Sequence, residues 1–116
     1  MADLELDPKQ TRGETTMTAL GFLVTLEAQP GREDEVVAFL MEAKALVDLE
    51  PGTRSWSAFR SGPSSFAIFD VFDSEHDRDV HLHGEVRKAL QARGGELFSQ
   101  APVITAVEVL AEKQQA

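Results

Sequence analysis

The amino-acid sequence predicts a single α+β domain of the ferredoxin-like class, with the element order βαββαβ and a four-stranded antiparallel sheet. Three observations favour this class. Residues 20–28 alternate apolar and polar side chains as a strand does, two apolar stretches flank the short loop 61–65, and two segments with helical spacing each follow acidic residues. Because βαβ crossovers are right-handed, both helices should cover the same face of the sheet.

The first strand and the first helix account for residues 20–50. Within 20–28, one face of the strand carries the apolar residues Leu20, Phe22, Val24 and Leu26. The sequence QPG at 29–31 then turns the chain, and acidic residues at 33–35 favour the first turn of a helix. Four apolar residues recur in this helix at helical spacing: Val36, Leu40, Ala43 and Val47. Pro51 and Gly52 should end it near Glu50.

The second and third strands cover residues 53–60 and 66–72, joined by the loop SGPSS. The third strand is apolar on both faces, and a lone carboxylate, Asp70, lies on the face of Ile68 and Phe72. A carboxylate in such surroundings costs free energy unless it is paired or hydrogen-bonded. Asp70 is therefore a candidate functional residue.

The second helix should begin in the acidic cluster 73–79, with Ser74 as its N-cap. Gly84 should kink or interrupt this helix, and the pair Gly94 and Gly95 should end its main body. Residues 103–110 form the last strand.

The composition excludes several classes of protein. A net charge of −9 argues against binding to nucleic acid or to an anionic membrane surface, and no apolar stretch is long enough for a transmembrane helix. The absence of cysteine excludes disulfides and thiolate chemistry and suits a cytoplasmic location. The polar residues 1–18 predict a flexible tail, with Met1 or Met17 as the natural start. The domain is then expected over 19–112, with a flexible C-terminus over 113–116.

The apolar character of both sheet faces predicts a homodimer. The two helices cover only one face, and a domain this small has no further element to cover the other. An uncovered apolar face is uncommon in monomers. We expect a second copy to pack against the residues Leu23, Ala67, Phe69, Val71, Ile104 and Ala106.

Several local patterns resemble the antibiotic biosynthesis monooxygenase family. They are the Pro30-Gly31 turn, the EPG sequence at 50–52, a carboxylate two residues before an aromatic (Asp70 and Phe72), and His81-Leu82 in an acidic helix. The resemblance covers residues 20 to about 112 and implies a dimeric α/β-barrel. It also implies a small oxygenase without flavin or metal, and the sequence carries no nucleotide-binding motif, so no cofactor is expected.

Two departures from this family narrow the expected chemistry. Its haem-degrading members use an Asn on the first strand, a Trp late on the third strand and a His late on the second helix. This chain has no such Asn, and Phe72 and Gln91 lie near the other two positions. Haem degradation is therefore not expected. The chain also lacks tyrosine, which excludes any mechanism that uses a tyrosine hydroxyl.

The candidate catalytic residues are His81 and Asp70. The resemblance implies that His81 is a pocket residue that accepts a proton. A regular helix would instead turn His83 inward and His81 outward, and a kink at Gly84 would reverse this. Asp70 could serve as a base with a raised pKa, or it could be paired with Arg54, Arg60 or a helix residue. A purely structural histidine remains the alternative for His81.

The expected pocket would bind a small aromatic molecule. Its candidate substrate-binding residues are Trp56, Phe66, Phe69, Phe72, Leu23 and His83. Aromatic rings on strands can stack on a planar substrate, although plain core packing is the alternative. His76, Asp79 and His83 share a helical face, but the first and last are too far apart to hold one metal ion, so no metal is expected.

The resemblance, together with the absence of a cofactor motif, implies a cofactor-independent monooxygenase that uses dioxygen and a quinol- or anthrone-like aromatic substrate. Such a substrate can reduce oxygen itself once a proton is removed, so the protein supplies a dry pocket, a base and orientation. The alternative is a non-catalytic dimeric barrel that binds a small apolar ligand. A pocket closed by side chains, or an Asp70 locked in an ion pair, would favour this alternative.

Overall fold

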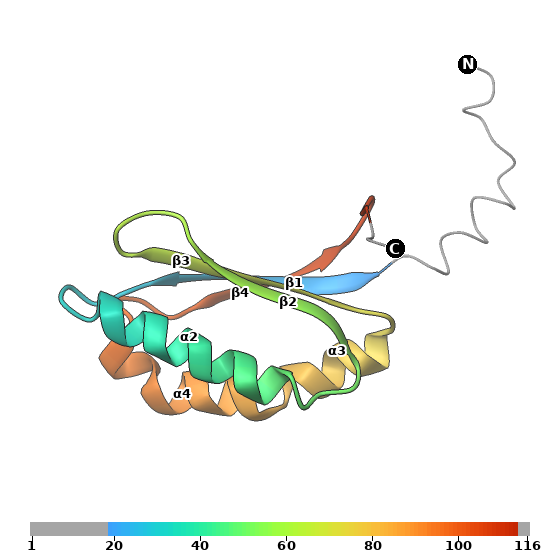
Figure 1. Ribbon diagram of the computed structural model, residues 1–116, viewed down its shortest axis with the longest axis horizontal. Helices are drawn as coiled ribbons and strands as arrows, with labels where there is room; N and C mark the ends of the chain where they lie inside the picture. Colours follow the sequence, from blue (N-terminus) through green and yellow to red (C-terminus); the bar gives the residue numbers. More distant parts are fainter. Residues whose placement is uncertain (1–18, 114–116) are drawn as a thin grey trace, which may run out of the picture.

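The computed structural model of the chain describes residues 19–113 (Figure 1). The tail predicted over residues 1–18 lies outside the described residues, as do residues 114–116 of the predicted C-terminal segment. The elements in chain order are β1 (Leu20–Glu27), α2 (Glu33–Val47), β2 (Thr53–Arg60), β3 (Ser65–Phe72), α3 (Glu75–Leu82), α4 (Glu85–Leu97) and β4 (Val103–Glu108).

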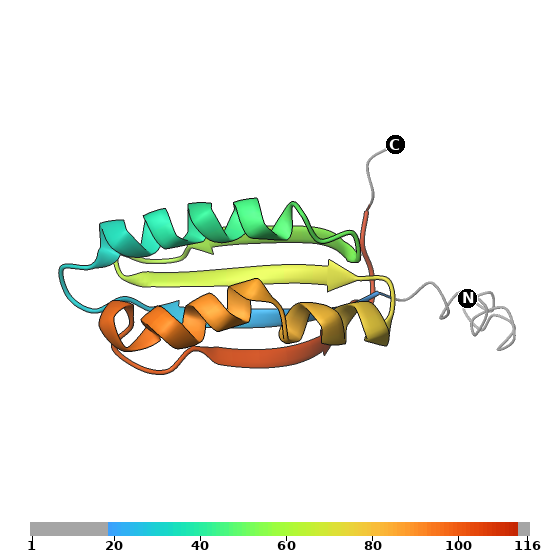
Figure 2. The ribbon, with the colours of Figure 1, turned by 90° about the horizontal axis from the view of Figure 1, so that it is seen from below.

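The four strands form one antiparallel sheet in the order β2-β3-β1-β4. All three helices lie on the same face of this sheet, as Figure 1 shows from the side and Figure 2 from below. The predicted ferredoxin-like class is confirmed, with two layers and the central strands β1 and β3 between the edge strands. The core lies between the layers, because alternate residues of β1 and β3 point towards the helices.

Helix α2 packs on the sheet with the stripe that its sequence predicts. Its buried residues are Val36, Phe39, Leu40, Ala43 and Val47. The helix follows a turn in which Gly31 adopts a φ of 86°, a conformation that favours glycine. It ends at Val47, slightly before the expected Glu50, and the N–H of Glu50 donates to the carbonyl of Val47 in the turn that follows.

The predicted second helix is in fact two helices, separated at His83 and Gly84. The hydroxyl of Ser74 accepts a hydrogen bond from the N–H of Asp77 at 3.1 Å, so the predicted N-cap of α3 is confirmed. The predicted end at Gly94 and Gly95 is wrong, because α4 continues to Leu97. Leu97 is fully buried, and this burial offsets the conformational cost of the two glycines.

The face of the sheet opposite the helices is partly apolar and partly exposed. Leu23, Phe59 and Val103 are exposed there, whereas Ala67 and Val71 are already buried within the single chain. The expected position of Ile104 and Ala106 on this face is wrong. They pair with Val24 and Phe22 across β1 and therefore point towards the helices, while the open face carries Val103, Thr105 and Val107.

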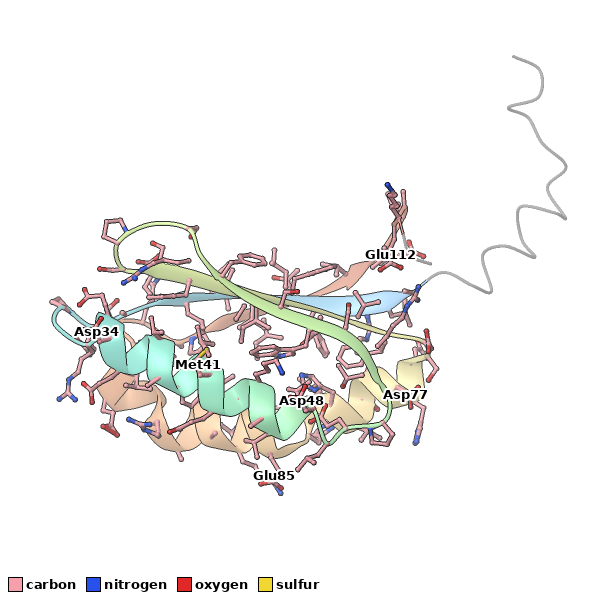
Figure 3. All side chains as sticks on the ribbon, in the orientation of Figure 1. Asp34, Met41, Asp48, Asp77, Glu85 and Glu112 are labelled. Atoms are coloured by element: carbon pink, nitrogen blue, oxygen red, sulfur yellow. The ribbon has the colours of Figure 1, made fainter. Side chains whose placement is uncertain are left out.

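The chain after β4 turns away from the helices. Figure 3 shows Glu112 beyond the sheet on the side opposite the helix layer. Its carboxylate lies 2.7 Å from the guanidinium of Arg54, which also contacts Asp73 at 3.2 Å. None of the helices in the described part of the chain is long and apolar enough to cross a membrane.

Candidate functional site

Asp70 lies at the middle of the sheet, on the face that the helices cover. It is directly opposite Phe22 of β1 on one side and Trp56 of β2 on the other. Only 1% of its surface is exposed. One carboxylate oxygen, Oδ1, accepts the backbone N–H of Phe22 at 3.1 Å. A carboxylate this deeply buried requires further partners, and helix α3 supplies one.

That partner is His81, in the last turn of α3. Its Nε2 lies 3.1 Å from Oδ2 of Asp70, and its Nδ1 lies 2.6 Å from Oε1 of Glu50. Glu50 belongs to the turn between α2 and β2, where its Oε1 also accepts the hydroxyl of Thr53 at 2.7 Å. The imidazole ring packs against Phe72 with ring centroids 4.9 Å apart. We call Asp70, His81 and Glu50 the carboxylate–histidine cluster.

The surroundings of His81 favour its protonated form. Burial lowers the pKa of its imidazole. The hydrogen bonds and negative charges of Asp70 and Glu50 raise it by a larger amount, so the pKa lies above its ordinary value. In the protonated form, both ring nitrogens are donors and each has a carboxylate acceptor. The cluster then carries one net negative charge, and His81 has no free nitrogen with which to accept a further proton.

A cavity of about 30 Å³ lies between the sheet and helices α3 and α4. It has room for about one or two water molecules. Its lining residues with polar groups are Asp70, His81, Trp56 and Arg87, and the rest of its wall is apolar. The indole Nε1 of Trp56 is buried and has no hydrogen-bond partner within the described part of the chain. The cavity therefore combines an ionised pair with a donor that lacks an acceptor.

The structure brings together only some of the predicted site residues. Asp70, His81 and Trp56 line the cavity, and Phe72 packs behind the imidazole. Phe66 is buried in the core away from the cavity lining. Leu23 and Phe69 lie on the opposite face of the sheet. They form the pair next to Phe22 and Asp70, and successive residues of a strand point to opposite faces.

A regular helix would turn His83 inward and His81 outward, and this expectation is wrong. The helix is interrupted at Gly84, and the two orientations are reversed, as the alternative predicted. His81 is buried, whereas His83, which follows the last residue of α3, is exposed, with its Nδ1 3.0 Å from the carbonyl of Asp79. The expectation treated residues 75–97 as one regular helix, whereas the structure has two separate helices there, α3 and α4. His83 is therefore outside the cavity that it was expected to line.

The partner of Asp70 answers one question that the sequence left open. Of the expected alternatives, the helix residue is the partner. Arg54 instead pairs with Asp73 and Glu112, and Arg60 lies over the ring of Phe66.

The sequence did not reveal the role of Glu50, which served only as part of a turn signal. Its contact with His81 joins residues far apart in the chain, so no local pattern indicates it. Arg87 and Ile104 of the cavity wall were missed for the same reason. Among residues 19–113, no group of three or more metal-ligating side chains could hold a metal ion.

Comparisons with known proteins agree with this architecture. The chain is 44% identical to the NE2512 protein of Nitrosomonas europaea, a protein of unknown function; the match covers 87% of this chain and 98% of that one, with a TM-score of 0.82. The Rv0793 protein of Mycobacterium tuberculosis is 20% identical over 83% of this chain and 99% of that one, with a TM-score of 0.74.

A third solved structure bears on the resemblance noted in the sequence. A Caulobacter crescentus protein provisionally named an antibiotic biosynthesis monooxygenase is 22% identical over 86% of this chain and 99% of that one, with a TM-score of 0.70. The resemblance is therefore confirmed at the level of the fold. No protein-family model and no curated protein matches the sequence.

Proposed function

We propose that this chain, which belongs to the family of the Nitrosomonas europaea NE2512 protein, is a cofactor-independent monooxygenase. The proposal starts from its fold, which is that of the antibiotic biosynthesis monooxygenases. Its substrate is an electron-rich aromatic molecule of the quinol or anthrone type. The carboxylate–histidine cluster in the wall of the cavity is the single observation that carries this proposal.

The physical cost of the cluster supports a functional role. Buried ion pairs contribute little net stability, because removing the charges from water offsets their attraction. An apolar pair of the same size would hold α3 against the sheet at least as well. The cluster instead places a negatively charged oxygen of Asp70 beside a cavity whose wall is otherwise mostly apolar. That arrangement suits a base that acts on an acidic C–H or O–H group.

Asp70 is the proton acceptor in this mechanism. His81 has both nitrogens engaged with carboxylates, so it keeps the Asp70 carboxylate oriented and remains its hydrogen-bond donor during transfer. For an anthrone, the CH₂ group loses a proton to Asp70 and the resulting anion reduces dioxygen. One oxygen atom becomes the new carbonyl oxygen, and the other leaves as water with the two hydrogens of the CH₂ group. The substrate supplies all the electrons, so no external reductant is required.

A homodimer is part of the same proposal. Leu23, Phe59 and Val103 expose apolar surface on the open face of the sheet, next to the half-buried Phe69. A second copy packed sheet to sheet would cover this surface. Burying about 500 Å² of apolar area on each subunit contributes about 12 kcal/mol per subunit before the costs of association.

The size of the cavity favours a second candidate function. A space of about 30 Å³ does not admit a three-ring substrate unless lining side chains move. Both oxygens of Asp70 also already accept a hydrogen bond, one from Phe22 and one from His81. Both features fit a non-catalytic barrel that binds a small ligand. In the catalytic proposal, the half-buried side chains of Trp56 and Arg87 move to admit the substrate.

Oxygen uptake with a panel of anthrones and quinols tests the proposal. We expect turnover by the wild type and a loss of about 100-fold or more in kcat for Asp70→Asn, since general-base catalysis contributes about 10²–10⁴-fold. The matched control is Asp73→Asn, which makes the same change at an exposed carboxylate three residues along the chain. Absence of turnover with every substrate, or equal rates for Asp70→Asn and the wild type, would favour the non-catalytic function.

A further inference from the structure

Trp56 presents a hydrogen-bond donor that the fold does not use. It is the only tryptophan of the chain, it lies on β2 directly opposite Asp70, and it lines the cavity. Its Nε1 is buried, and no acceptor among residues 19–113 lies within hydrogen-bond distance. An unsatisfied buried donor costs about 1–3 kcal/mol, and buried indole N–H groups usually have a partner. The partner is therefore expected to be something that enters the cavity.

The carboxylate of Asp70, opposite Trp56, can accept further hydrogen bonds. Oδ1 of Asp70 accepts one hydrogen bond from Phe22, and Oδ2 accepts one from His81. A carboxylate oxygen has two lone pairs, so each can accept one more hydrogen bond. Two lining residues on neighbouring strands, Trp56 and Asp70, thus bring a free donor and acceptor capacity to the same cavity. Residues directly opposite on antiparallel strands have Cβ atoms about 5 Å apart.

We propose that this cavity binds the hydroxyl group of an aromatic ligand between Trp56 and Asp70. The hydroxyl oxygen accepts the N–H of Trp56, and the hydroxyl hydrogen is donated to a carboxylate oxygen of Asp70. A hydroxyl is both donor and acceptor, whereas a ring without one satisfies neither residue. This inference deepens the proposed function and rests on it for the aromatic character of the ligand, but binding requires no turnover.

The arrangement also has a consequence for the reaction. For a quinol, the acidic proton is that of the hydroxyl. When this proton moves to Asp70, the oxygen of the resulting phenolate remains a hydrogen-bond acceptor for Trp56. The indole N–H then stabilises the anion in the wall of a mostly apolar cavity, where such a bond is stronger than in bulk water. Trp56 is therefore expected to determine specificity for hydroxylated aromatic rings over the same rings without the hydroxyl.

Because the chain has one tryptophan, its indole N–H gives a single signal in a ¹⁵N–¹H spectrum of the full chain. We would titrate the wild type with 1-naphthol, naphthalene and 1-naphthoate. The expected result is a downfield shift of the indole N–H with 1-naphthol alone, and at least tenfold tighter binding of 1-naphthol than of naphthalene. Equal affinity for naphthalene would overturn the proposal. Tighter binding of 1-naphthoate would also overturn it, because the cation Arg87 would then be the anchor.

Substitution separates the role of the N–H from that of the ring. Trp56→Phe keeps an aromatic side chain without the donor, and the affinities of 1-naphthol and naphthalene should then differ by less than about threefold. Ser57→Ala, on the same strand but on the opposite face of the sheet, should retain the wild-type preference. Retention of the preference by Trp56→Phe would overturn the proposal. The titration of the wild type decides the matter if the variant fails to fold.

The two proposals fail in different ways. A selective shift with 1-naphthol but no oxygen uptake with any substrate would leave the hydroxyl site intact and remove the oxygenase. Oxygen uptake with anthrones but no selectivity between 1-naphthol and naphthalene would leave the oxygenase intact and remove the hydroxyl site.

Discussion

The Nε2 of His81 and the Oδ2 of Asp70 lie 3.1 Å apart, and this contact joins the helix layer to the middle of the sheet. His81 is the only buried residue of α3 within the range 75–82, where most other side chains are charged. The helix therefore lacks the apolar stripe that normally anchors a helix to a sheet. The polar contacts of His81 therefore hold α3 on the sheet together with the partly buried Leu82, which packs against the core.

Removing the charge of Asp70 should destabilise the fold. Asp70→Asn keeps the shape of the side chain but leaves the protonated His81 with one anionic partner in place of two. We expect the free energy of unfolding to fall by about 2 kcal/mol, the usual contribution of a hydrogen bond to a charged group. Urea denaturation of the variant and the wild type measures this difference.

The control for this prediction is Asp73→Asn, which removes an exposed carboxylate from a surface ion pair with Arg54. Such pairs contribute about 1 kcal/mol or less. Equal losses for the two substitutions would show that the buried position of Asp70 has no special role.

The stability of the domain should depend on pH through His81. Its pKa is raised in the folded state by Asp70 and Glu50, whose effect exceeds that of burial, while in the unfolded chain it is about 6.5. The folded state therefore binds the proton more tightly. The resulting stabilisation is complete below about pH 6.5 and is lost as pH rises through the folded pKa.

Urea midpoints from pH 6 to pH 9 measure this effect. The wild type should lose stability over this range more steeply than His81→Gln, because the variant lacks the titrating group. His83→Gln, at an exposed position, should follow the wild type. A variant at His81 with the wild-type slope would contradict the assignment of this pH dependence to the carboxylate–histidine cluster.

The open face of the sheet should mediate dimer formation. Phe69→Asp places a charge in the middle of this face, next to Leu23, and should convert a dimer into a monomer or an aggregate. Sedimentation velocity at micromolar concentration distinguishes these states. Met41→Asp, at an exposed position of α2 that Figure 3 labels on the helix layer, should remain a dimer. A well-folded wild-type monomer would refute the proposed sheet-to-sheet dimer.

The sequence was sufficient to predict most of the fold. Alternation defines β1 without ambiguity, because only one of its faces is strongly apolar. It was insufficient for β4, where Val103, Ile104, Ala106 and Val107 give both faces a similar character. The register with β1 decides which of these residues point towards the helices, and that register depends on contacts between distant parts of the chain.

The candidate site was only partly predictable. Asp70 was identified because a lone carboxylate in an apolar strand is physically costly. The inward orientation of His81 could not be obtained by treating residues 75–97 as one regular helix, because the chain breaks there into α3 and α4. Glu50 reaches His81 from a turn that is remote in sequence. Its contribution can be seen only once the chain has folded.

The central claim is that Asp70 removes a proton from the bound substrate, and hydrogen–deuterium exchange without oxygen tests it most directly. In anaerobic D₂O buffer, the CH₂ signal of an anthrone should disappear from the proton spectrum faster with the wild type than with buffer alone. Asp70→Asn should reduce this exchange to the buffer rate, and Asp73→Asn should leave it unchanged. Exchange no faster than in buffer, or equally fast with Asp70→Asn, would contradict the role of Asp70 as the base.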